Sequence, residues 1–195
     1  MNSRSPLLVF CTSVLFCINL SAFAADSAHR ENSDISVSAE IAALRETAQG
    51  GSAESQYMLG ELFEYGRGVQ QNDSKAAYWY ELAATQDFAS AQYRLAILYD
   101  NGWGSPVNKE KAYSLYKAAA ENGVELAQHD LAISYYQGSG TDKSLLQAYK
   151  WLRVAELNGS TLMQKHLKLV AAEMSAVEIE AAENLAVRWI EQNQK

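Results

Sequence analysis

The chain has 195 residues, of which 16 are basic and 23 are acidic, so its formal net charge is −7 at pH 7. An acidic chain without clustered Lys and Arg is a poor match for phosphate backbones, and we therefore exclude nucleic acid as a partner. Hydrophobic residues make up 48% of the sequence, which is enough for a sizeable core.

Residues 1–24 have the features of an export signal. Arg4 supplies positive charge before an apolar run over residues 7–20, and an Ala-x-Ala pattern follows, which predicts cleavage after Ala24. The alternative is an uncleaved membrane anchor, but the run is shorter than the roughly 20 residues that span a bilayer. We therefore expect a periplasmic or secreted protein with no stable membrane insertion after signal removal.

Both cysteines, Cys11 and Cys17, lie inside this predicted signal. The mature chain would then enter an oxidising compartment without a thiol, so neither disulfides nor cysteine-ligated metals can stabilise it. Residues 25–35 are polar and lack periodicity, and we expect a disordered lead-in there. Residues 36–49 have an amphipathic pattern, which predicts a single helix that caps the domain.

A repeat of 36 residues occupies the middle of the chain. Shifting the sequence by 36 residues brings Gly66, Gly102 and Gly138 into register without a gap. The same shift aligns further sets, which are Gln56, Gln92 and Gln128; Leu59, Leu95 and Leu131; Phe63, Tyr99 and Tyr135; Gly68, Gly104 and Gly140; Ala76, Ala112 and Ala148; Ala83, Ala119 and Ala155. This agreement predicts three full units, over residues 52–87, 88–123 and 124–159.

Each unit is predicted to form two helices joined by a Gly-x-Gly turn. In the first unit, Leu59, Leu62 and Phe63 have the i, i+3, i+4 spacing of an amphipathic helix, and apolar residues over 76–84 repeat it. The first glycine of the turn can take the left-handed conformation that ends a helix. The second helix then begins after a good N-cap residue, which is Asn72, Asn108 or Ser144.

Stacking of the units must supply most of the stability, because helices of about 13 residues are marginal alone in water. We expect Trp79, Leu115 and Trp151 to fill the space between units. Residues 160–192 predict a degenerate capping pair, in which Leu162, Leu167 and Val170 mark a first helix. A capping box, Ser175-x-x-Glu178, opens the last helix.

The motif Ala-x-Ala-Gln-Tyr-x-Leu-Ala-x-x-Tyr-x-x-Gly-x-Gly runs from Ala89 to Gly104, and Asn-x-x-Lys-Ala begins at Asn108. This pattern resembles the Sel-one-like repeat, a relative of the tetratricopeptide repeat, over about residues 36–192. The resemblance implies an all-α fold, a right-handed α-solenoid of antiparallel helix pairs whose first helices line a concave surface. It also implies an adaptor or scaffold in exported bacterial systems.

Motifs for catalysis and cofactor binding are not found in the sequence. The Gly-x-Gly turns lack the preceding strand, third glycine and Lys-Ser or Lys-Thr of a nucleotide-binding loop. His129 and His166 lie on separate predicted helices without a His or Glu partner at i+4, so we expect no metal. Adjacent helix residues point about 100° apart, so we expect Asp130 not to orient the His129 ring as a catalytic base requires. We therefore expect a protein without a cofactor that is not an enzyme.

The first helices also carry side chains that packing does not require. We expect Leu59, Leu95 and Leu131 to be buried. The residues one and two places before each of them should then face the concave side, and so should the residue two places after Leu59. The residues expected to bind a partner are Tyr57, Glu61, Tyr93, Arg94, His129, Asp130, Lys165 and His166. Aromatic rings with both signs of charge suit a protein or peptide. Equally, the tyrosine rings could belong to the core between repeats.

The function expected from the sequence is that of an exported adaptor that holds a protein or peptide on its concave face. The alternative is a cell-wall-active or β-lactam-hydrolysing enzyme, because some secreted relatives with a cysteine pair in each repeat are linked to such ligands. The predicted mature chain lacks those cysteines, and it offers no plausible pair of nucleophile and base. A recruiting scaffold within a motor or envelope assembly would differ from the first function only in its partner.

Overall fold

The computed structural model of the protein describes residues 38–160 and 163–193. The predicted signal, the predicted lead-in and Leu162 lie outside these residues. The chain divides into two units, Met1–Ala43 and Leu44–Lys195. A helix over residues 38–49 contains the boundary between them, and every later helix belongs to the second unit.

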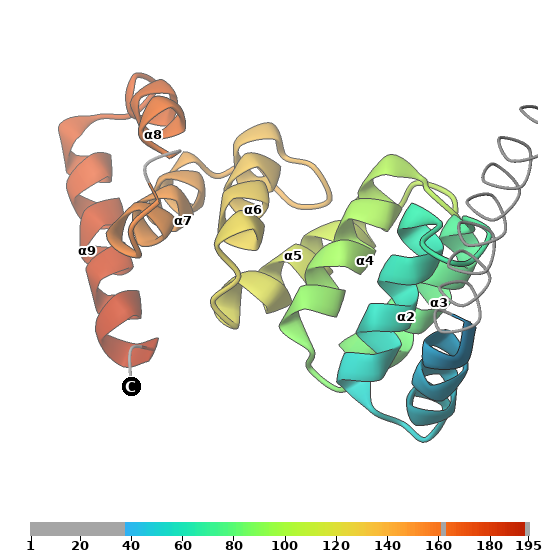
Figure 1. The fold of residues 1–195 in the computed structure, drawn as a ribbon. Coiled ribbons are helices and arrows are strands. Elements are labelled where there is room, and N and C mark those ends of the chain that lie inside the picture. The colour runs from blue at the N-terminus through green and yellow to red at the C-terminus, as the bar shows by residue number, and fades with distance from the viewer. Residues whose placement is uncertain (1–37, 161–162, 194–195) are drawn as a thin grey trace, which may run out of the picture. The chain divides into compact units, whose positions relative to one another are not determined.

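The second unit is a series of helix pairs (Figure 1). Helix α2 (Ala53–Tyr65) pairs with α3 (Asp73–Ala84), α4 (Ala89–Asn101) with α5 (Lys109–Glu121), and α6 (Glu125–Gln137) with α7 (Leu145–Leu157). Helices α8 (Gln164–Ala171) and α9 (Ala176–Asn193) follow, and both pack on α7. Residues 38–160 and 163–193 contain no strand. The all-α solenoid of antiparallel helix pairs expected from the sequence is confirmed.

The helix ends have the predicted local geometry. The first glycine of each turn ends a helix in the left-handed region, with φ of 67° at Gly66, 73° at Gly102 and 71° at Gly138. The predicted N-cap side chains accept a hydrogen bond from a backbone N–H three residues later, in Asn72, Asn108 and Ser144. The capping box at Ser175 is also formed, because the Glu178 carboxylate accepts from Ser175 N at 2.8 Å.

The second glycine of the turn joins one unit to the previous one, which the sequence analysis did not anticipate. A Cβ on Gly104 would lie 2.4 Å from the carbonyl carbon of Asp73, at the start of α3. A Cβ on Gly140 would lie 2.0 Å from the carbonyl oxygen of Lys109, at the start of α5. Real Cβ atoms do not approach backbone so closely, so these glycines permit the close contact between units.

The aligned glutamines form a second set of connections between units. Gln56 Nε2 donates to the Ala48 carbonyl at 3.0 Å, Gln92 to Ala84 at 3.4 Å, and Gln128 to Ala120 at 3.3 Å. The acceptors lie in the last turns of the preceding second helices, where carbonyl groups have no partner within the helix. The glutamines are buried, so these bonds form away from water.

The buried side chains form two clusters along the solenoid. One contains buried residues from Ala48 to Leu98, and the other contains buried residues from Ala96 to Ala186. Tyr99 and Leu115 are only partly buried and pack against both clusters. The contact between the two clusters therefore depends on few large side chains.

Candidate functional site

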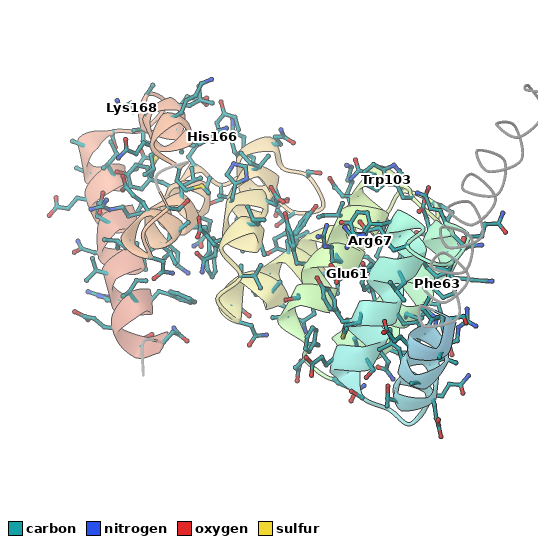
Figure 2. The ribbon with its side chains drawn as sticks, viewed as in Figure 1. Glu61, Phe63, Arg67, Trp103, His166 and Lys168 are labelled. Atoms are coloured by element: carbon teal, nitrogen blue, oxygen red, sulfur yellow. The ribbon has the colours of Figure 1, made fainter. Side chains whose placement is uncertain are left out.

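Helices α2, α4, α6 and α8 carry the side chains that the sequence predicted to contact a partner. We call them the first-helix row, and its members are Tyr57, Glu61, Tyr93, Arg94, His129, Asp130, Lys165 and His166. Figure 2 labels Glu61 and His166, which belong to the first and last helices of the row. The structure brings seven of the eight into two groups of direct contacts, which are described below.

The first group connects α2 with α4. Tyr57 Oη donates to Glu61 Oε1 at 2.9 Å, and Arg94 Nη2 lies 3.9 Å from the same carboxylate oxygen. Arg94 Nη1 also lies 3.7 Å from Glu64 Oε1. Burial and the hydrogen bond to Glu61 raise the pKa of Tyr57, so its hydroxyl remains a neutral donor near neutral pH.

Glu64 belongs to this group, although the sequence analysis did not select it. Its Oε2 accepts a hydrogen bond from Tyr80 Oη at 2.5 Å, so it connects Arg94 to the second helix α3. The signal that could have identified Glu64 is the repeat, because the residue 36 positions later is the acidic Asp100.

The second group connects α4 with α6 and α8. Tyr93 Oη donates to Asp130 Oδ2 at 3.1 Å, and Asp130 Oδ1 lies 2.8 Å from His129 Nδ1. The other ring nitrogen, His129 Nε2, lies 3.4 Å from His166 Nδ1. Four side chains from three helices therefore form one continuous polar chain.

The expectation that Asp130 cannot orient the His129 ring is wrong. The Cβ directions of neighbouring helix residues diverge as expected, but both side chains have enough reach for their polar ends to meet. A catalytic triad does not follow from this contact. The nitrogen that would have to face a nucleophile, His129 Nε2, faces His166 instead.

The two histidines of the row are in direct contact with each other. The rings of His129 and His166 pack edge to face with centroids 4.8 Å apart. Burial lowers the pKa of His166, and the neighbouring His129 and Lys165 lower it further. Lys165 is exposed. Among the described residues of the row, it interacts only with His166, through the electrostatic effect of its charge.

The tyrosines of the row also belong to the packing between helices. The Tyr57 ring lies 5.7 Å from that of Tyr80 and 5.2 Å from that of Phe88, and the Tyr93 ring lies 6.0 Å from that of Tyr116. Tyr57 and Tyr93 are nevertheless only partly buried. The two readings offered by the sequence are compatible, because one side of each ring packs while its hydroxyl stays in the polar row.

A cavity of about 340 Å³ adjoins the row between α4 and α6. Lys109 Nζ bonds Asp100 Oδ1 at 2.8 Å at its edge, and Asp130 and Tyr116 also line it. The cavity therefore places an ion pair beside the second contact group. Within the described ranges, no group of three or more His, Cys, Asp or Glu side chains is arranged to hold a metal ion.

The comparisons with known proteins agree on one family. The sequence profile of the Sel1 repeat matches residues 53–88, 89–124 and 126–160. The crystal structure of a protective antigen of uropathogenic Escherichia coli with an SLR fold is similar, with a TM-score of 0.71 and 28% identity over 78% of this chain and 33% of that chain. A Sel1 repeat protein from Oxalobacter formigenes has a TM-score of 0.61 and 29% identity over 66% of this chain and 97% of that chain.

This chain spans about a third of the length of the E. coli antigen, so that protein's activity as a whole does not transfer to it. Comparison with curated proteins gives no match. Among the residues that the structure describes, no helix has the length and apolar character needed to cross a membrane.

Proposed function

Because this chain belongs to the Sel1 repeat family, we propose that it is an exported adaptor that binds a protein or peptide segment along the first-helix row. Sel1 repeat proteins generally mediate protein–protein interaction, which supports a protein as the partner. Family membership does not select the binding face, and that part of the proposal depends on the side chains of the row.

The observation that carries the proposal is the partial exposure of the polar and aromatic side chains in both contact groups of the row. The side chains of Arg94 and Glu61 are 30% and 29% exposed, and those of His129 and Asp130 are 24% and 31% exposed. Such side chains are held in place by their neighbours yet still present polar atoms to a ligand. A prearranged surface of this kind binds with less loss of side-chain entropy than a flexible one.

The chemistry of the row suits a peptide segment with its own mixture of charges. Arg94 and the tyrosines are of the types enriched in contact surfaces. Glu61, Glu64 and Asp130 supply carboxylates that already accept hydrogen bonds from the tyrosines and ion pairs from Arg94. A partner that offers a carboxylate to Arg94 or a cation to the acids would exchange these contacts for new ones.

The first experiment removes the polar atoms of the row while keeping its ring packing. The triple variant Tyr57→Phe/Tyr93→Phe/Arg94→Gln retains both rings, so we expect unchanged helical content and a melting temperature within a few degrees of the original. Partners are first identified by copurification from the native cell envelope, and their affinity is then measured with purified components. We expect the triple variant to bind the identified partner at least tenfold more weakly.

The control makes the same types of change on second helices. Tyr78 and Lys117 are exposed on α3 and α5, so Tyr78→Phe/Lys117→Gln should leave partner affinity unchanged. Equal affinity of the triple variant and this control would show that the partner binds elsewhere. That result would remove the row from the proposal.

Export is the second part of the proposal, and it depends on the signal predicted over residues 1–24. Fractionation of the native cells, followed by sequencing of the mature amino terminus, tests it directly. We expect a periplasmic or secreted protein that begins at Ala25. A cytoplasmic protein that retains Met1 would contradict export, although it would not affect the binding experiment.

A further inference from the structure

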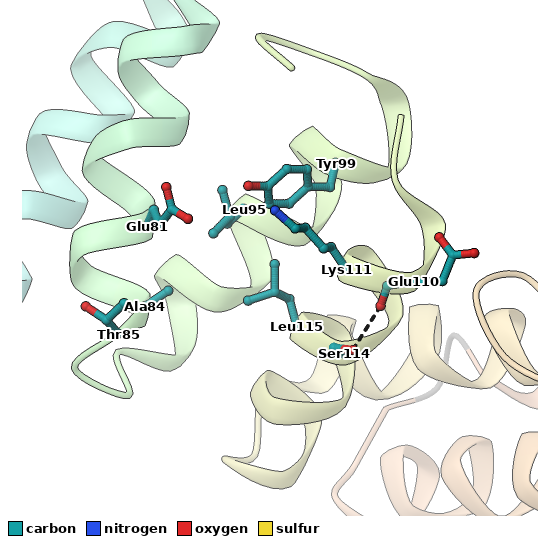
Figure 3. A pocket seen from close by; sticks show the side chains of 9 residues that line it. All are labelled: Glu81, Ala84, Thr85, Leu95, Tyr99, Glu110, Lys111, Ser114 and Leu115. Atoms are coloured by element: carbon teal, nitrogen blue, oxygen red, sulfur yellow. Dashed lines mark hydrogen bonds between the residues drawn. The ribbon is translucent and has the colours of Figure 1, made fainter. Parts of the chain in front are cut away.

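A cavity of about 400 Å³ lies between α3, α4 and α5 and shares no residue with the first-helix row (Figure 3). Ala84, Leu95, Leu115 and the ring of Tyr99 form its apolar part. Its polar lining residues are Glu81, Thr85, Glu110, Lys111 and Ser114. The volume falls within the range of ligand pockets, roughly 300–1,000 Å³.

The repeat explains why this space exists in the middle unit. Leu115 occupies the position that holds Trp79 in the first unit and Trp151 in the third. The residue before it is Ser114, whereas the other two units have Tyr78 and Lys150. The middle unit therefore lacks two large adjacent side chains that both other units possess.

The third unit has a lysine and a tryptophan at the two corresponding positions. Lys150 Nζ lies 4.2 Å from the centroid of the Trp151 ring, and Trp151 is only 3% exposed. Burial lowers the pKa of Lys150, and the charges of Glu121 and Lys117 also act on it. Lys117 and Glu121 are the repeat counterparts of Glu81 and Thr85, which line the cavity. In the third unit, then, a lysine lies over an indole at these positions, and the ring of Trp189 in α9 lies 5.2 Å from the same indole.

The first unit also has two large side chains at the corresponding positions. The rings of Tyr78 and Trp79 meet edge to face with centroids 5.1 Å apart. In both outer units, then, a large side chain covers a tryptophan ring at this register. The middle unit keeps the apolar surroundings of the third unit at Ala84, Leu95 and Tyr99, but it has only a serine and a leucine at these two positions.

We propose that this cavity binds a basic residue adjacent to a tryptophan, Lys-Trp or Arg-Trp, presented by a partner peptide or protein. The indole would occupy the space beside Leu95, Leu115 and Tyr99, as Trp151 occupies its own position. Burial of an aromatic ring is a strong anchor for a short segment. A cation stacked over that ring would add to it, as it does within the third unit.

The charges at the cavity select a basic neighbour for the indole. Glu81 contributes a carboxylate, which has no ion-pair partner in the described part of the chain, whereas the Glu110 carboxylate points away from the cavity (Figure 3). The single cation, Lys111, is already placed over the Tyr99 ring at 4.9 Å. The Glu81 carboxylate is therefore available to Lys or Arg of a partner, whereas the cation of the site is already engaged with a ring.

The experiment uses the full chain and three end-blocked tetrapeptides, Gly-Lys-Trp-Gly, Gly-Ala-Trp-Gly and Gly-Lys-Ala-Gly. Binding is followed by titration calorimetry and by amide chemical shifts. We expect saturable binding of the Lys-Trp peptide, at least tenfold weaker binding of the Lys-Ala peptide, and several-fold weaker, less salt-sensitive binding of the Ala-Trp peptide. Absence of saturable Lys-Trp binding, or equal affinity for all three peptides, would overturn the proposal.

Variants that fill the cavity locate the binding. Ser114→Lys/Leu115→Trp installs the pair that the third unit already accommodates, and we expect at least a tenfold loss of Lys-Trp affinity with unchanged helical content. Ser114→Lys alone changes an exposed position that should not affect folding, and it should also weaken binding. The matched control, Ser90→Lys, adds the same charge at an exposed position of α4 and should bind normally.

This proposal is independent of the proposed function. The triple variant of the first-helix row should bind the Lys-Trp peptide as the original protein does. If both filled variants bind as tightly as Ser90→Lys, the peptide lies elsewhere and the cavity is not its site.

Discussion

At the second glycine of the turn, the absence of a Cβ atom lets two units come into contact. Gly104 and Gly140 have positive φ, and both also lie directly against the backbone at the start of the preceding second helix. Gly123 has a positive φ of 85° as well, but a Cβ there would meet no atom within 4 Å. Comparing substitutions at Gly140 and Gly123 therefore separates the free-energy cost of backbone strain from that of steric contact.

Replacement of Gly140 by Ala should be more harmful than replacement of Gly123 by Ala. Positive φ costs a non-glycine residue about 1–2 kcal/mol, and overpacking adds about 1–3 kcal/mol. We therefore expect Gly140→Ala to lower the free energy of unfolding by more than about 2 kcal/mol, and Gly123→Ala by about half as much. Urea unfolding of the two variants measures both values, and equal losses would show that contact between units contributes nothing.

The lowered pKa of His166 makes a prediction about acid stability. Since the folded state favours the neutral ring, His166 stabilises the fold fully above its ordinary pKa of about 6.5, and the contribution is lost as the pH falls through the lower folded-state pKa. His166→Gln should therefore flatten the pH dependence of the free energy of unfolding between pH 7.5 and pH 5. An unchanged dependence would show that the histidine pair does not couple to folding.

Single helices owe their limits to residues at their ends. Helix α5 has 13 residues, which is about the length that is marginal alone in water. Its start is set by the Asn108 side chain, which accepts from Lys111 N at 2.9 Å. Its partner α4 ends at Gly102, where a Cβ would meet Val107 Cγ2 at 2.8 Å. Start and stop are both local features, although α5 persists only because it packs on its neighbours.

Removal of the cap of α5 should have a moderate and specific cost. Asn108→Ala loses the bond to Lys111 N, and we expect the free energy of unfolding to fall by about 1 kcal/mol. Asn108→Asp keeps an acceptor at the same place and should remain close to the original protein. Thermal unfolding of the pair provides the comparison, and equal melting temperatures for both variants would contradict the capping role.

At the scale of the whole molecule, stability is distributed between the two buried clusters that Tyr99 and Leu115 connect. In a repeat protein, each unit contacts chiefly its neighbours, so a weak interface between units can separate the unfolding of the two sides. The cavity beside Leu115 lies at this connection. The place that we propose for an external tryptophan is thus also a place where the solenoid is incompletely packed.

Leu115→Ala should uncouple the two clusters, whereas Leu152→Ala should weaken one of them. Leu152 is fully buried within the second cluster, so its truncation should cost about 2–5 kcal/mol without changing cooperativity. For Leu115→Ala we expect hydrogen exchange of α3 and α7 to report different opening free energies, even if the total loss is smaller. A single shared opening free energy in that variant would contradict the weak connection.

The sequence by itself determined the features that depend on neighbouring residues in the chain. The αL turns at Gly66, Gly102 and Gly138, the three N-caps and the Ser175 capping box all involve atoms within a few residues of one another. Their geometry follows from backbone conformation and one short side chain, and the 36-residue period repeats it in each unit. For the same reason, the helix pairs and the solenoid could be predicted before any tertiary contact was known.

Only the tertiary structure decided how the units meet and which side chains become partners. Tyr93 and Asp130 are 37 residues apart, and so are His129 and His166, so their contacts depend on the stacking of helices from successive units. The same stacking places Gly140 against Lys109 and leaves space beside Leu115. A residue's periodic position predicts the direction of its Cβ, but the separation and rotation of neighbouring helices determine what its polar end can reach.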